Sequence, residues 1–499
     1  MPARPHSRSR TPRTRDAAIG ATIRSDIPPR LDALGFTAWH RRVVIALGIT
    51  WVLDGLEASL VANLGPSLAS PHALGLSAAE LGYTSSLYLI GQVLGALVFG
   101  HLTDRLGRKR LFMVTLLLYL AATALSGLAP SYAVFAVFRL LAGAGIGGEY
   151  SAINSAIDEL VPARVRGRVD LAINGSYWLG VAGGAGLTLV LLDPHVVPLA
   201  LGWRLAFGSG AILGLVIAVF RHDLPESPRW LLMHGYTREA GAVTDDIERR
   251  CGDVTYRNVT DHNIEPVAVT VHGPVSFAHL AHTLLVRYRR RTILGLALML
   301  AQAFLYNAIF FSDALILERF HGVAADRVGL YILPFAAGNF LGPLALGPLF
   351  DRIGRRAMIP ITYALSGILL VATGALFAGG YLDAMTQTLA WSLVFFVASA
   401  AASSAYLTVS ELFPVELRGM AIALFYAFGT LVGAAAPALF GRIVDTGDPL
   451  NLFYGYVLAS ALMVGAAVVA RAFGVAAEGR SLEALAADSD DMPSARVVP

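Results

Sequence analysis

The sequence predicts an all-α membrane protein with twelve transmembrane helices in two pseudo-symmetric six-helix bundles. Of its 499 residues, 56% are hydrophobic and only 15% are charged, whereas soluble proteins carry about 25% charged residues. Apolar runs long enough to cross about 30 Å of hydrocarbon, which takes about 20 residues each, recur along the chain. Two charged motifs of the first half return in the same order in the second half, which indicates an internal duplication.

The apolar runs divide into two sets of six. The first set forms an expected N-terminal bundle over 43–220, with spans near 43–64, 80–100, 111–129, 132–153, 169–191 and 203–220. The second set forms an expected C-terminal bundle over 292–473, with spans near 292–312, 327–349, 357–378, 386–408, 419–440 and 452–473.

The polar segments flank and separate these bundles. Residues 1–42 have no apolar core and are expected to be a disordered cytosolic tail, and no signal peptide is expected because no apolar segment precedes Val43. Residues 221–291 are expected to form a cytosolic central loop with short helices, including an amphipathic helix over Thr237–Arg250. Residues 474–499 are expected to be a second cytosolic tail.

The repeated motifs are charged and lie between apolar runs. Gly100–Arg110 reads GHLTDRLGRKR and Gly347–Arg356 reads GPLFDRIGRR; ELVPARVRG at Glu159–Gly167 matches ELFPVELRG at Glu411–Gly419. Such segments cannot lie in hydrocarbon, so each is expected to be a water-facing turn or helix end. Because arginines crowd these turns and the opposite turns have few, both termini are expected to be cytosolic.

These motifs resemble the major facilitator superfamily, which carries D-R-x-G-R-R/K between helices 2 and 3 and again between helices 8 and 9. The resemblance covers Trp39 to Glu483. LPESPRWLL at Leu224–Leu232 is similar to the segment that follows helix 6 in the sugar-porter branch, and AEGRSLE at Ala477–Glu483 resembles that branch's final motif without its Pro and Thr. Pro225 and Pro228 are expected to begin helical turns; the alternative is a plain linker.

Ionisable residues inside the apolar runs are candidates for proton coupling, because each costs at least about 2.5 kcal/mol at mid-membrane. Asp54 and Glu57 are three residues apart and share one helical face. Two desolvated carboxylates this close are not expected to be ionised together, so at least one is expected to bind a proton.

Arg139 and Glu149 lie in the fourth run. At about 1.5 Å per residue, Glu57 and Arg139 both lie about 20 Å from the cytosolic side, so Arg139 is positioned to pair with Glu57 or Asp54. Arg139–Gly147 reads RLLAGAGIG and resembles R-x-x-x-G-x-G-x-G of proton-coupled sugar porters, whose arginine faces an acid in helix 1. That resemblance implies Glu57 as the acid; the alternative is a static pair that holds two helices together.

Asp54 and Glu149 resemble residues of another branch. DGLE at Asp54–Glu57 is similar to the D-G-x-D of aromatic-acid and related metabolite symporters, and GGEY at Gly147–Tyr150 is similar to metabolite symporters. Glu149 is either a second titrating residue or a helix contact. The predicted spans of the second half have no charge in their middle, so protons are expected to move through the first half.

Neutral polar and aromatic residues in the spans are candidates for solute binding, because such groups orient a small molecule in an apolar cavity. They are Asn174, Tyr177, Trp178, Gln302, Tyr306, Asn307, Asn339, Trp391 and Tyr406. AQAFLYN at Ala301–Asn307 lacks one Gln and the Gly of the sugar porters' Q-Q-x-x-G-x-N, and ASSAY at Ala402–Tyr406 departs from G-P-x-x-W. These departures weaken the expectation of a hexose or pentose. For each candidate the alternative is helix packing.

The charged motifs also predict two cytosolic gates. The first consists of Asp104, Arg108, Glu159 and Arg166, and the second of Asp351, Arg355, Glu411 and Arg418. Exposed ion pairs give only about 0–1 kcal/mol each, but a network at a bistable interface can set the balance between two states. The alternative role for these residues is in folding and membrane topology.

The predicted function is secondary active transport by alternating access, as proton-coupled symport of a small organic metabolite such as a sugar, an organic acid or an aromatic acid. Proton-driven efflux and a non-transporting membrane sensor are the alternatives. An enzyme is not expected, because no nucleotide loop, zinc-ligand spacing or Ser-His-Asp pattern occurs.

The expected partners are a small-molecule substrate, protons and the lipid bilayer of a bacterial plasma (inner) membrane. Nucleic acid is not an expected partner, and the chain is expected to act as a monomer. Cys251 is the single cysteine, so no disulfide and no cysteine metal cluster is expected. Neither a metal nor a cofactor is expected.

Overall fold

The computed structural model describes residues 16–18, 20–106, 108–161, 163–221, 225–252, 266–271, 282–413 and 415–474. The chain forms two compact units. Unit 2, made of Ile45–Asn154, Leu171–Asp223 and Ser276–Pro499, holds the long apolar helices. Unit 1, made of Met1–Val44, Ser155–Asp170 and Leu224–Val275, holds the polar segments between them.

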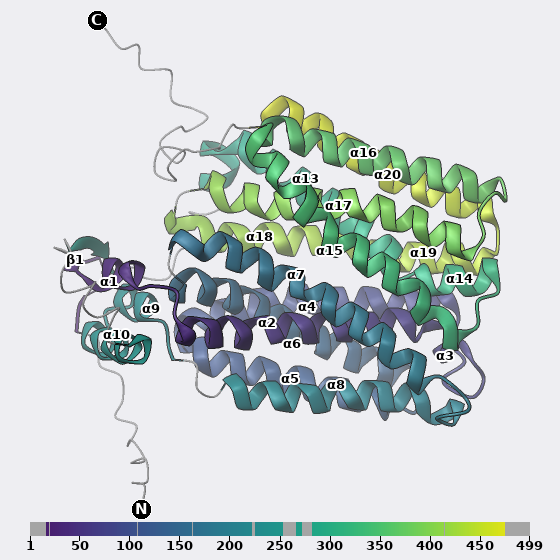
Figure 1. Cartoon of the computed structure of the whole chain (residues 1–499), viewed down its shortest axis with the longest axis horizontal. Helices are drawn as coiled ribbons and strands as arrows, with labels where there is room; N and C mark the ends of the chain where they lie inside the picture. Colours follow the sequence, from purple (N-terminus) through teal and green to yellow (C-terminus); the bar gives the residue numbers. More distant parts are fainter. Residues whose placement is uncertain are drawn as a thin grey trace, which may run out of the picture. The chain divides into compact units, whose positions relative to one another are not determined.

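The first half of the chain forms a long helix at each predicted span and one short helix besides (Figure 1). They are α2 (Ala38–Asn63), α3 (Gly65–Ala69), α4 (Ala78–Leu106), α5 (Arg108–Gly127), α6 (Tyr132–Leu160), α7 (Ala163–Leu191) and α8 (Leu199–Arg221). The short helix α3 continues α2 after Leu64, with Pro66 in its first turn, where a missing N–H costs no hydrogen bond.

The second half repeats this arrangement. It contains the π-helix η1 (Thr283–Arg287), α13 (Arg289–Phe310), α14 (Asp313–His321), the 3₁₀-helix η2 (Ala325–Arg327), α15 (Val328–Arg352), α16 (Arg355–Ala378), α17 (Ala384–Leu412), α18 (Val415–Gly433), α19 (Ala435–Thr446) and α20 (Pro449–Phe473). Asp383 and Asp448 cap α17 and α20 by accepting backbone N–H bonds from Thr386 and Leu450. Gly354, with φ of 97°, allows the chain to reverse between α15 and α16.

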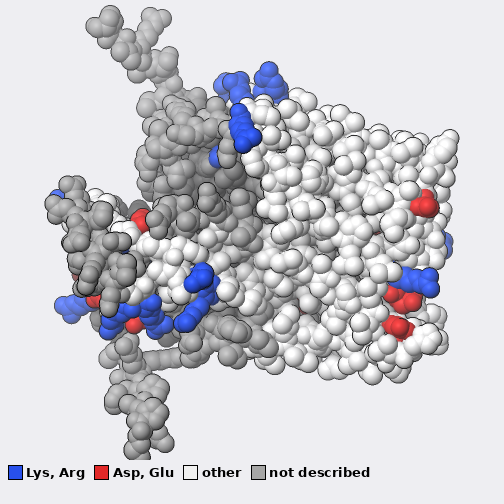
Figure 2. Space-filling model, viewed as in Figure 1, with Lys and Arg blue, Asp and Glu red and all other residues white. Residues whose placement is uncertain are grey.

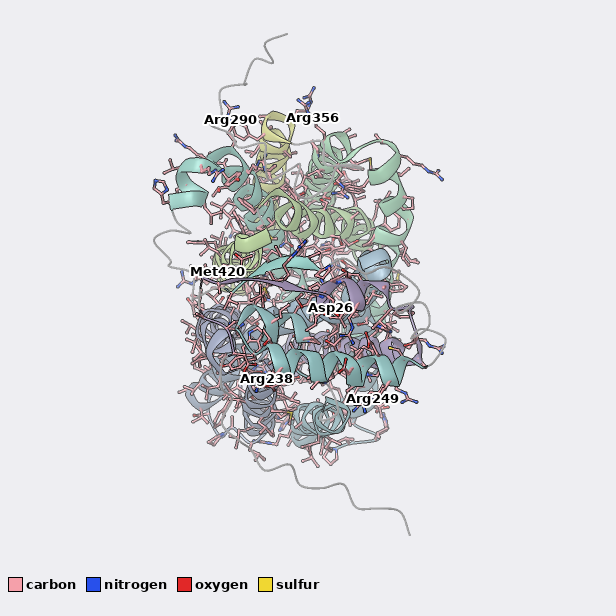
Figure 3. The ribbon with its side chains drawn as sticks, turned by 90° about the vertical axis from the view of Figure 1, so that its left-hand side faces the viewer. Asp26, Arg238, Arg249, Arg290, Arg356 and Met420 are labelled. Carbon is pink, nitrogen blue, oxygen red and sulfur yellow. The ribbon has the colours of Figure 1, made fainter. Side chains whose placement is uncertain are left out.

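Among the described residues, nine helices are long and apolar enough to cross a membrane, and three shorter apolar helices lie at Leu111–Gly127, Gly175–Leu191 and Ala200–Leu215. Together they account for the twelve predicted spans. On the face shown in Figure 2, the middle of the helical body is uncharged and charged side chains gather toward its ends. Arg290 and Arg356, at the starts of α13 and α16, lie at the same edge of the view in Figure 3.

Within unit 2, α16 packs on α20, α15 on α17, α13 on α18 and α5 on α8, and α4 packs on α18 and α19 of the other half. Small residues allow the closest approaches. A methyl group at Gly180 of α7 would overlap the carbonyl oxygen of Val52 in α2, and one at Gly82 of α4 would overlap that of Pro437 in α19. Backbones therefore touch directly at these crossings.

Two sequence-based expectations about connectors need correction. The segment Gly100–Arg110 is not an open turn: α4 remains helical to Leu106 and α5 begins at Arg108. Charged residues are compatible with helix where a helix end projects beyond the hydrocarbon, so the apolar run marks the span and not the helix end. Pro225 does not begin a helical turn, whereas Pro228 does, as the first residue of α9 (Pro228–Met233) with Ser227 as its N-cap.

Unit 1 shows that the expectation of disorder is wrong for residues 20–42. Strand β1 (Thr22–Ser25) pairs antiparallel with β2 (Val267–Thr270), with Thr22 opposite Thr270. Helix α1 (Ile27–Ala33) packs on α9 and on α10 (Thr237–Cys251). Pairing with a strand more than 240 positions away leaves no local signal in the N-terminal sequence, which is why composition alone suggested a free tail.

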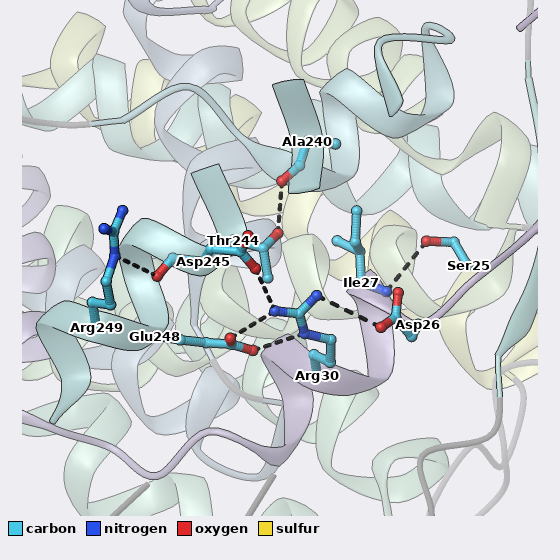
Figure 4. Close-up of polar contacts among 9 residues, drawn as sticks. All are labelled: Ser25, Asp26, Ile27, Arg30, Ala240, Thr244, Asp245, Glu248 and Arg249. Carbon is cyan, nitrogen blue, oxygen red and sulfur yellow. Dashed lines mark hydrogen bonds and ion pairs between the residues drawn. The ribbon is translucent and has the colours of Figure 1, made fainter. Parts of the chain in front are cut away.

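Helix α10 confirms the predicted amphipathic helix, and Arg238 and Arg249 mark its two ends in Figure 3. Figure 4 shows how α1 is held against it: the Arg30 guanidinium donates to Glu248 at 2.6 and 2.8 Å and to Asp245 at 2.6 Å. Glu248 is only 2% exposed. A bidentate arginine–carboxylate contact of this kind is stronger and more specific than an exposed pair.

Candidate functional site

A buried ion pair lies among the N-terminal helices of unit 2. Arg139 of α6 donates from Nη1 to Glu57 Oε1 of α2 at 2.5 Å, and both side chains are 0% exposed. Counting residues along the two helices predicts Glu57 or Asp54 as the partner of Arg139. The structure pairs Arg139 with Glu57. A guanidinium in direct contact with a carboxylate forms a charge-assisted hydrogen bond, so each member compensates the charge of the other.

Neutral side chains complete the surroundings of the pair. Thr123 and Tyr119 of α5 donate to Glu57 at 2.8 and 3.3 Å. The guanidinium also lies over the rings of Tyr88 in α4 and Phe207 in α8, 4.7 and 5.5 Å from their centres. Arg139 Nε and Nη2 have no hydrogen-bond partner within the described part of the chain. The arginine is thus held by a single carboxylate and by aromatic faces.

Asp54 lies one helical turn before Glu57, on the same side of α2. It interacts electrostatically with Glu57 and with Glu149, and the Tyr88 hydroxyl is close to it. Its Oδ1 is buried without a well-formed hydrogen bond, although the residue as a whole is partly exposed. Three carboxyl groups and one arginine therefore share this region, which is one positive charge for three acids if all were ionised.

An aromatic cluster lies next to these acids and joins the two halves. Tyr177 of α7 interacts with Asp54 and also with the tyrosines of the second half, Tyr306, Tyr406 and Tyr426. The ring of Trp178 lies 6.3 Å from that of Tyr306, 6.2 Å from that of Phe310 and 6.0 Å from that of Phe335. Residues from α7, α13, α15 and α17 thus meet here, because Phe395 of α17 packs on Tyr306 at 4.8 Å.

Polar groups at the edge of this cluster are few. Tyr306 donates to Asn339 Oδ1 at 2.9 Å, and Asn339 Nδ2 donates to the carbonyl of Phe335 at 3.1 Å. Tyr426 contacts Gln92 Oε1 of α4 at 3.5 Å. Large aromatic faces with a small number of oriented polar atoms are typical of sites for small, mostly apolar ligands.

Not every predicted solute residue joins the cluster. Gln302 is 7% exposed and its amide nitrogen contacts Met299 Sδ at 4.0 Å. The amide of Asn307 lies against Gly433, at the junction of α18 and α19. Trp391, 1% exposed, lies beside Tyr456 of α20 in the interior of the C-terminal helices. The side chain of Asn174 falls outside the described residues.

The side chains of the predicted gates lie almost entirely outside the part of the chain that the structure describes. Of the eight side chains, only that of Arg355 is described; the other seven are Asp104, Arg108, Glu159, Arg166, Asp351, Glu411 and Arg418. The structure instead shows contacts between the halves at the opposite helix ends. Asp445 of α19 accepts from the backbone N–H groups of Ala78 and Ala79, the first residues of α4, at 3.0 and 2.8 Å. In the same region Ser86 accepts from the N–H of Ala438 at 3.1 Å.

Sequence reasoning missed several neighbours of the site. Tyr119 and Thr123 are spaced by four in an apolar run, and this polar stripe on one helical face was a usable signal. The aromatic residues Phe310, Phe335 and Phe395 gave no such signal, since phenylalanine is common throughout apolar spans. Tyr426 and Gln92 come together only through the packing of α4 on α18.

The sequence is similar to that of known membrane transporters over nearly its whole length. A family model described as "Sugar (and other) transporter" matches residues 54–488. The niacin transporter NiaP of Acinetobacter baylyi is 27% identical over 462 residues, which is 92% of this chain and 99% of that protein. Myo-inositol transporter 2 of Schizosaccharomyces pombe is 27% identical over 449 residues, covering 85% of this chain and 78% of that protein.

The fold is similar to that of solved transporter structures. The crystal structure of a D-xylose-proton symporter matches with a TM-score of 0.67 at 20% identity, over 89% of this chain and all of that one. The inward open conformation of the xylose transporter XylE from Escherichia coli matches with the same score, over 90% of this chain and 99% of that one. At this identity the likeness shows the fold alone, and it agrees with the predicted twelve-helix arrangement.

Proposed function

Because the chain belongs to the sugar (and other) transporter family, and is therefore an integral multi-pass transporter and not an enzyme, we propose that it couples the uptake of a small aromatic metabolite to protons. The observation that carries the proposal is the fully buried pair of Glu57 and Arg139, with Asp54 beside it and Tyr177 between Asp54 and the aromatic cluster. A charge pair at this depth is costly to bury, and a transport role accounts for that cost.

The coupling step follows from competition for Glu57. When Glu57 is ionised, Arg139 is its counter-ion and both charges are compensated. Protonation of Glu57 removes that compensation, and Arg139 then favours an ionised Asp54 or Glu149 in the same region. Since Tyr177 interacts electrostatically with both Asp54 and the tyrosines of the second half, a change in charge at Asp54 acts on the walls of the solute site.

The substrate class follows from the cluster around Trp178. Its described walls are aromatic on several sides, with rings from Tyr306, Phe310 and Phe335 within 6.3 Å of the indole. Flat aromatic solutes gain stacking contacts that a sugar does not. The relative named as a niacin transporter supports the same class.

The orientation belongs to the same proposal. Arg290 and Arg356 mark the helix ends that carry most arginines, and we assign this side, together with both termini, to the cytosol of a bacterial inner membrane. The helix ends joined by Asp445 then face outward, so the structure corresponds to a state whose external side is closed. The two predicted charge clusters near Arg355 are assigned to the opposite, cytosolic gate.

Uptake by proteoliposomes tests the proposal. Radiolabelled nicotinate should accumulate above its equilibrium level when the lumen is made alkaline, and an ionophore that dissipates the pH gradient should abolish the accumulation. Xylose and myo-inositol serve as comparison solutes. Accumulation of a sugar or inositol but not of nicotinate would reject the aromatic substrate class. Outward movement of nicotinate against the gradient would indicate efflux, and no movement or counterflow of any solute would favour the sensor.

A further inference from the structure

A buried acid stands in the second half of the chain, where the apolar spans predicted none. Asp313 opens α14 directly after the span Arg289–Phe310 and is 2% exposed. Its Oδ1 accepts a hydrogen bond from the N–H of Ala314 at 2.6 Å. No cation among the described residues contributes to its electrostatic environment. It therefore differs from Glu57, which has an arginine.

Buried polar side chains without well-formed hydrogen bonds lie on the helices around Tyr456, the tyrosine that interacts with Asp313. Tyr456 of α20 interacts electrostatically with Asp313 and lies beside Trp391 of α17. The Tyr456 hydroxyl and the Trp391 indole nitrogen are buried without a well-formed hydrogen bond, and so are both amide atoms of Gln387, one helical turn before Trp391. Unpaired buried polar groups reduce stability, so packing alone does not explain this set, which we call the Asp313 cluster (Asp313, Gln387, Trp391 and Tyr456).

A carboxyl group in this setting favours its neutral form, because burial penalises the charge and no cation compensates it. Burial raises the pKa of Asp313, which lies beyond the apolar span, to about 8. As long as it is buried, Asp313 therefore holds a proton at neutral pH.

The charged and titratable side chains on the helices around Asp313 do not compete for this proton. The helices packed against α14 are α3, α15 and α19, and α17 and α20 carry Trp391 and Tyr456. Besides Tyr456, their described charged and titratable side chains, with those of α14, are Glu318, Arg319, His321, Tyr331, Arg352, Asp383, Tyr406, Arg442, Asp445, Tyr454 and Arg471. Among the described residues, none of these side chains forms a hydrogen bond or an ion pair with Asp313.

Helix α14, which carries Asp313, contacts the first half of the chain. Gly65 of α3, in the first half, lies against Leu315 of α14, at a distance where an added methyl group would be 3.1 Å from the leucine side chain. Asp445 and Ser86 join α4 to α19 at the same end of the helices. Opening this end would separate α3 from α14, the helix whose first turn carries Asp313.

We propose that Asp313 is a second proton-binding site, in the C-terminal helices, that holds its proton while the external side is closed and releases it when that side opens. The proposal rests on the proposed transport function for its role, but not for the existence of the site.

Infrared spectroscopy of the purified protein tests whether Asp313 binds a proton, independently of transport. A protonated carboxyl group has a stretching band separate from that of a carboxylate. Wild-type protein labelled with ¹³C-aspartate should show this band at pH 7 and lose it between about pH 7 and 9. In an Asp54→Asn background, which removes the aspartate of the proton-coupling region, Asp313→Asn should lack the band, whereas Glu318→Gln, a change at an exposed position of α14, should keep it.

A second variant and a second measurement complete the test. Tyr456→Phe removes only the hydroxyl beside Asp313 and should shift the band and its titration midpoint, which keeps the site testable if Asp313→Asn does not fold. In proteoliposomes, Asp313→Asn should leave solute counterflow intact. An unchanged band in both Asp313→Asn and Tyr456→Phe, or an aspartate band absent from the wild type, would overturn the proposal. Loss of all solute movement in the wild type would instead reject the proposed function.

Discussion

Arg139 and Glu57 form the one ion pair, among the residues that the structure describes, in which both side chains are fully buried. Removing one member of a buried pair leaves an uncompensated charge and costs about 3–5 kcal/mol. Replacement of both members by apolar residues avoids that penalty. The pair is therefore expected to be strongly coupled energetically.

A double-mutant cycle measures this coupling. Arg139→Met is expected to lower the free energy of unfolding by about 3–5 kcal/mol, and the double variant Arg139→Met/Glu57→Leu should be more stable than Arg139→Met alone. The measurement is thermal unfolding in detergent followed by tryptophan fluorescence. Additive effects of the two changes would show that the two side chains do not depend on each other.

The crossing of α2 and α7 gives a matched pair of glycine substitutions. Gly180→Ala places a methyl group into the carbonyl oxygen of Val52, which cannot move without shifting the backbone, whereas Gly183→Ala on the same helix meets nothing within 4 Å. Overpacking costs about 1–3 kcal/mol, while alanine in an open helical position is favourable by about 0.5–1 kcal/mol. Only Gly180→Ala should lower the unfolding temperature. Equal unfolding temperatures for the two variants would contradict the close approach of α2 and α7 at Gly180.

The aromatic cluster predicts how the solute site responds to loss of an indole. Trp178→Ala removes an indole whose centre lies 6.0–6.3 Å from the centres of three neighbouring rings. Each aromatic contact is worth about 0.5–1.5 kcal/mol. The half-saturation concentration for nicotinate uptake should rise about 2–10-fold, and Trp178→Phe should restore most of the affinity. A change in maximal rate with unaltered affinity would place Trp178 outside the solute site.

The contact of Asp445 with α4 predicts a shift between conformations. Asp445→Ala removes two hydrogen bonds and a negative charge from the first turn of α4, an interaction of about 0.3–1 kcal/mol for the charge alone. The external side should open more often. Asp448→Ala is the control, because Asp448 caps α20 within the second half.

A reporter cysteine at Ser86 reads out that opening. Since Cys251 is the single cysteine, a Cys251→Ser background makes Ser86→Cys the only reactive thiol. A membrane-impermeant maleimide added outside should label it a few-fold faster in Asp445→Ala than in Asp448→Ala. Equal labelling rates in both variants would show that Asp445 does not stabilise the closed external side.

The helical spans could be predicted from the sequence because each is a local property, determined by about 20 apolar residues in a row. The pairing of Arg139 with a helix-1 acid was accessible for a similar reason, since depth can be counted along two helices. Which acid it meets depends on the rotation of α2 against α6, and that required the structure.

Features that depend on contacts between distant parts of the chain could not be predicted from the sequence. The pairing of Thr22 with Thr270 depends on two strands at opposite ends of unit 1. The burial of Asp313 depends on α14 being packed by α3, α15 and α19, although the residue falls just past an apolar run and looked like the start of a loop. The aromatic cluster contains residues of both kinds. Trp178 and Tyr306 were predicted from the sequence, whereas Phe310, Phe335 and Phe395 were not.

The central claim is that proton binding at Glu57 drives solute accumulation, and the most direct test compares Glu57→Gln with the wild type in proteoliposomes carrying an inside-alkaline pH gradient. Glutamine keeps the shape of the side chain but cannot exchange a proton. The account predicts that Glu57→Gln loses at least about 90% of gradient-driven nicotinate accumulation, equivalent to about 1.4 kcal/mol of coupling or more, while nicotinate counterflow without a gradient continues. Gradient-driven accumulation at the wild-type level in Glu57→Gln, and also in Asp54→Asn, would contradict it.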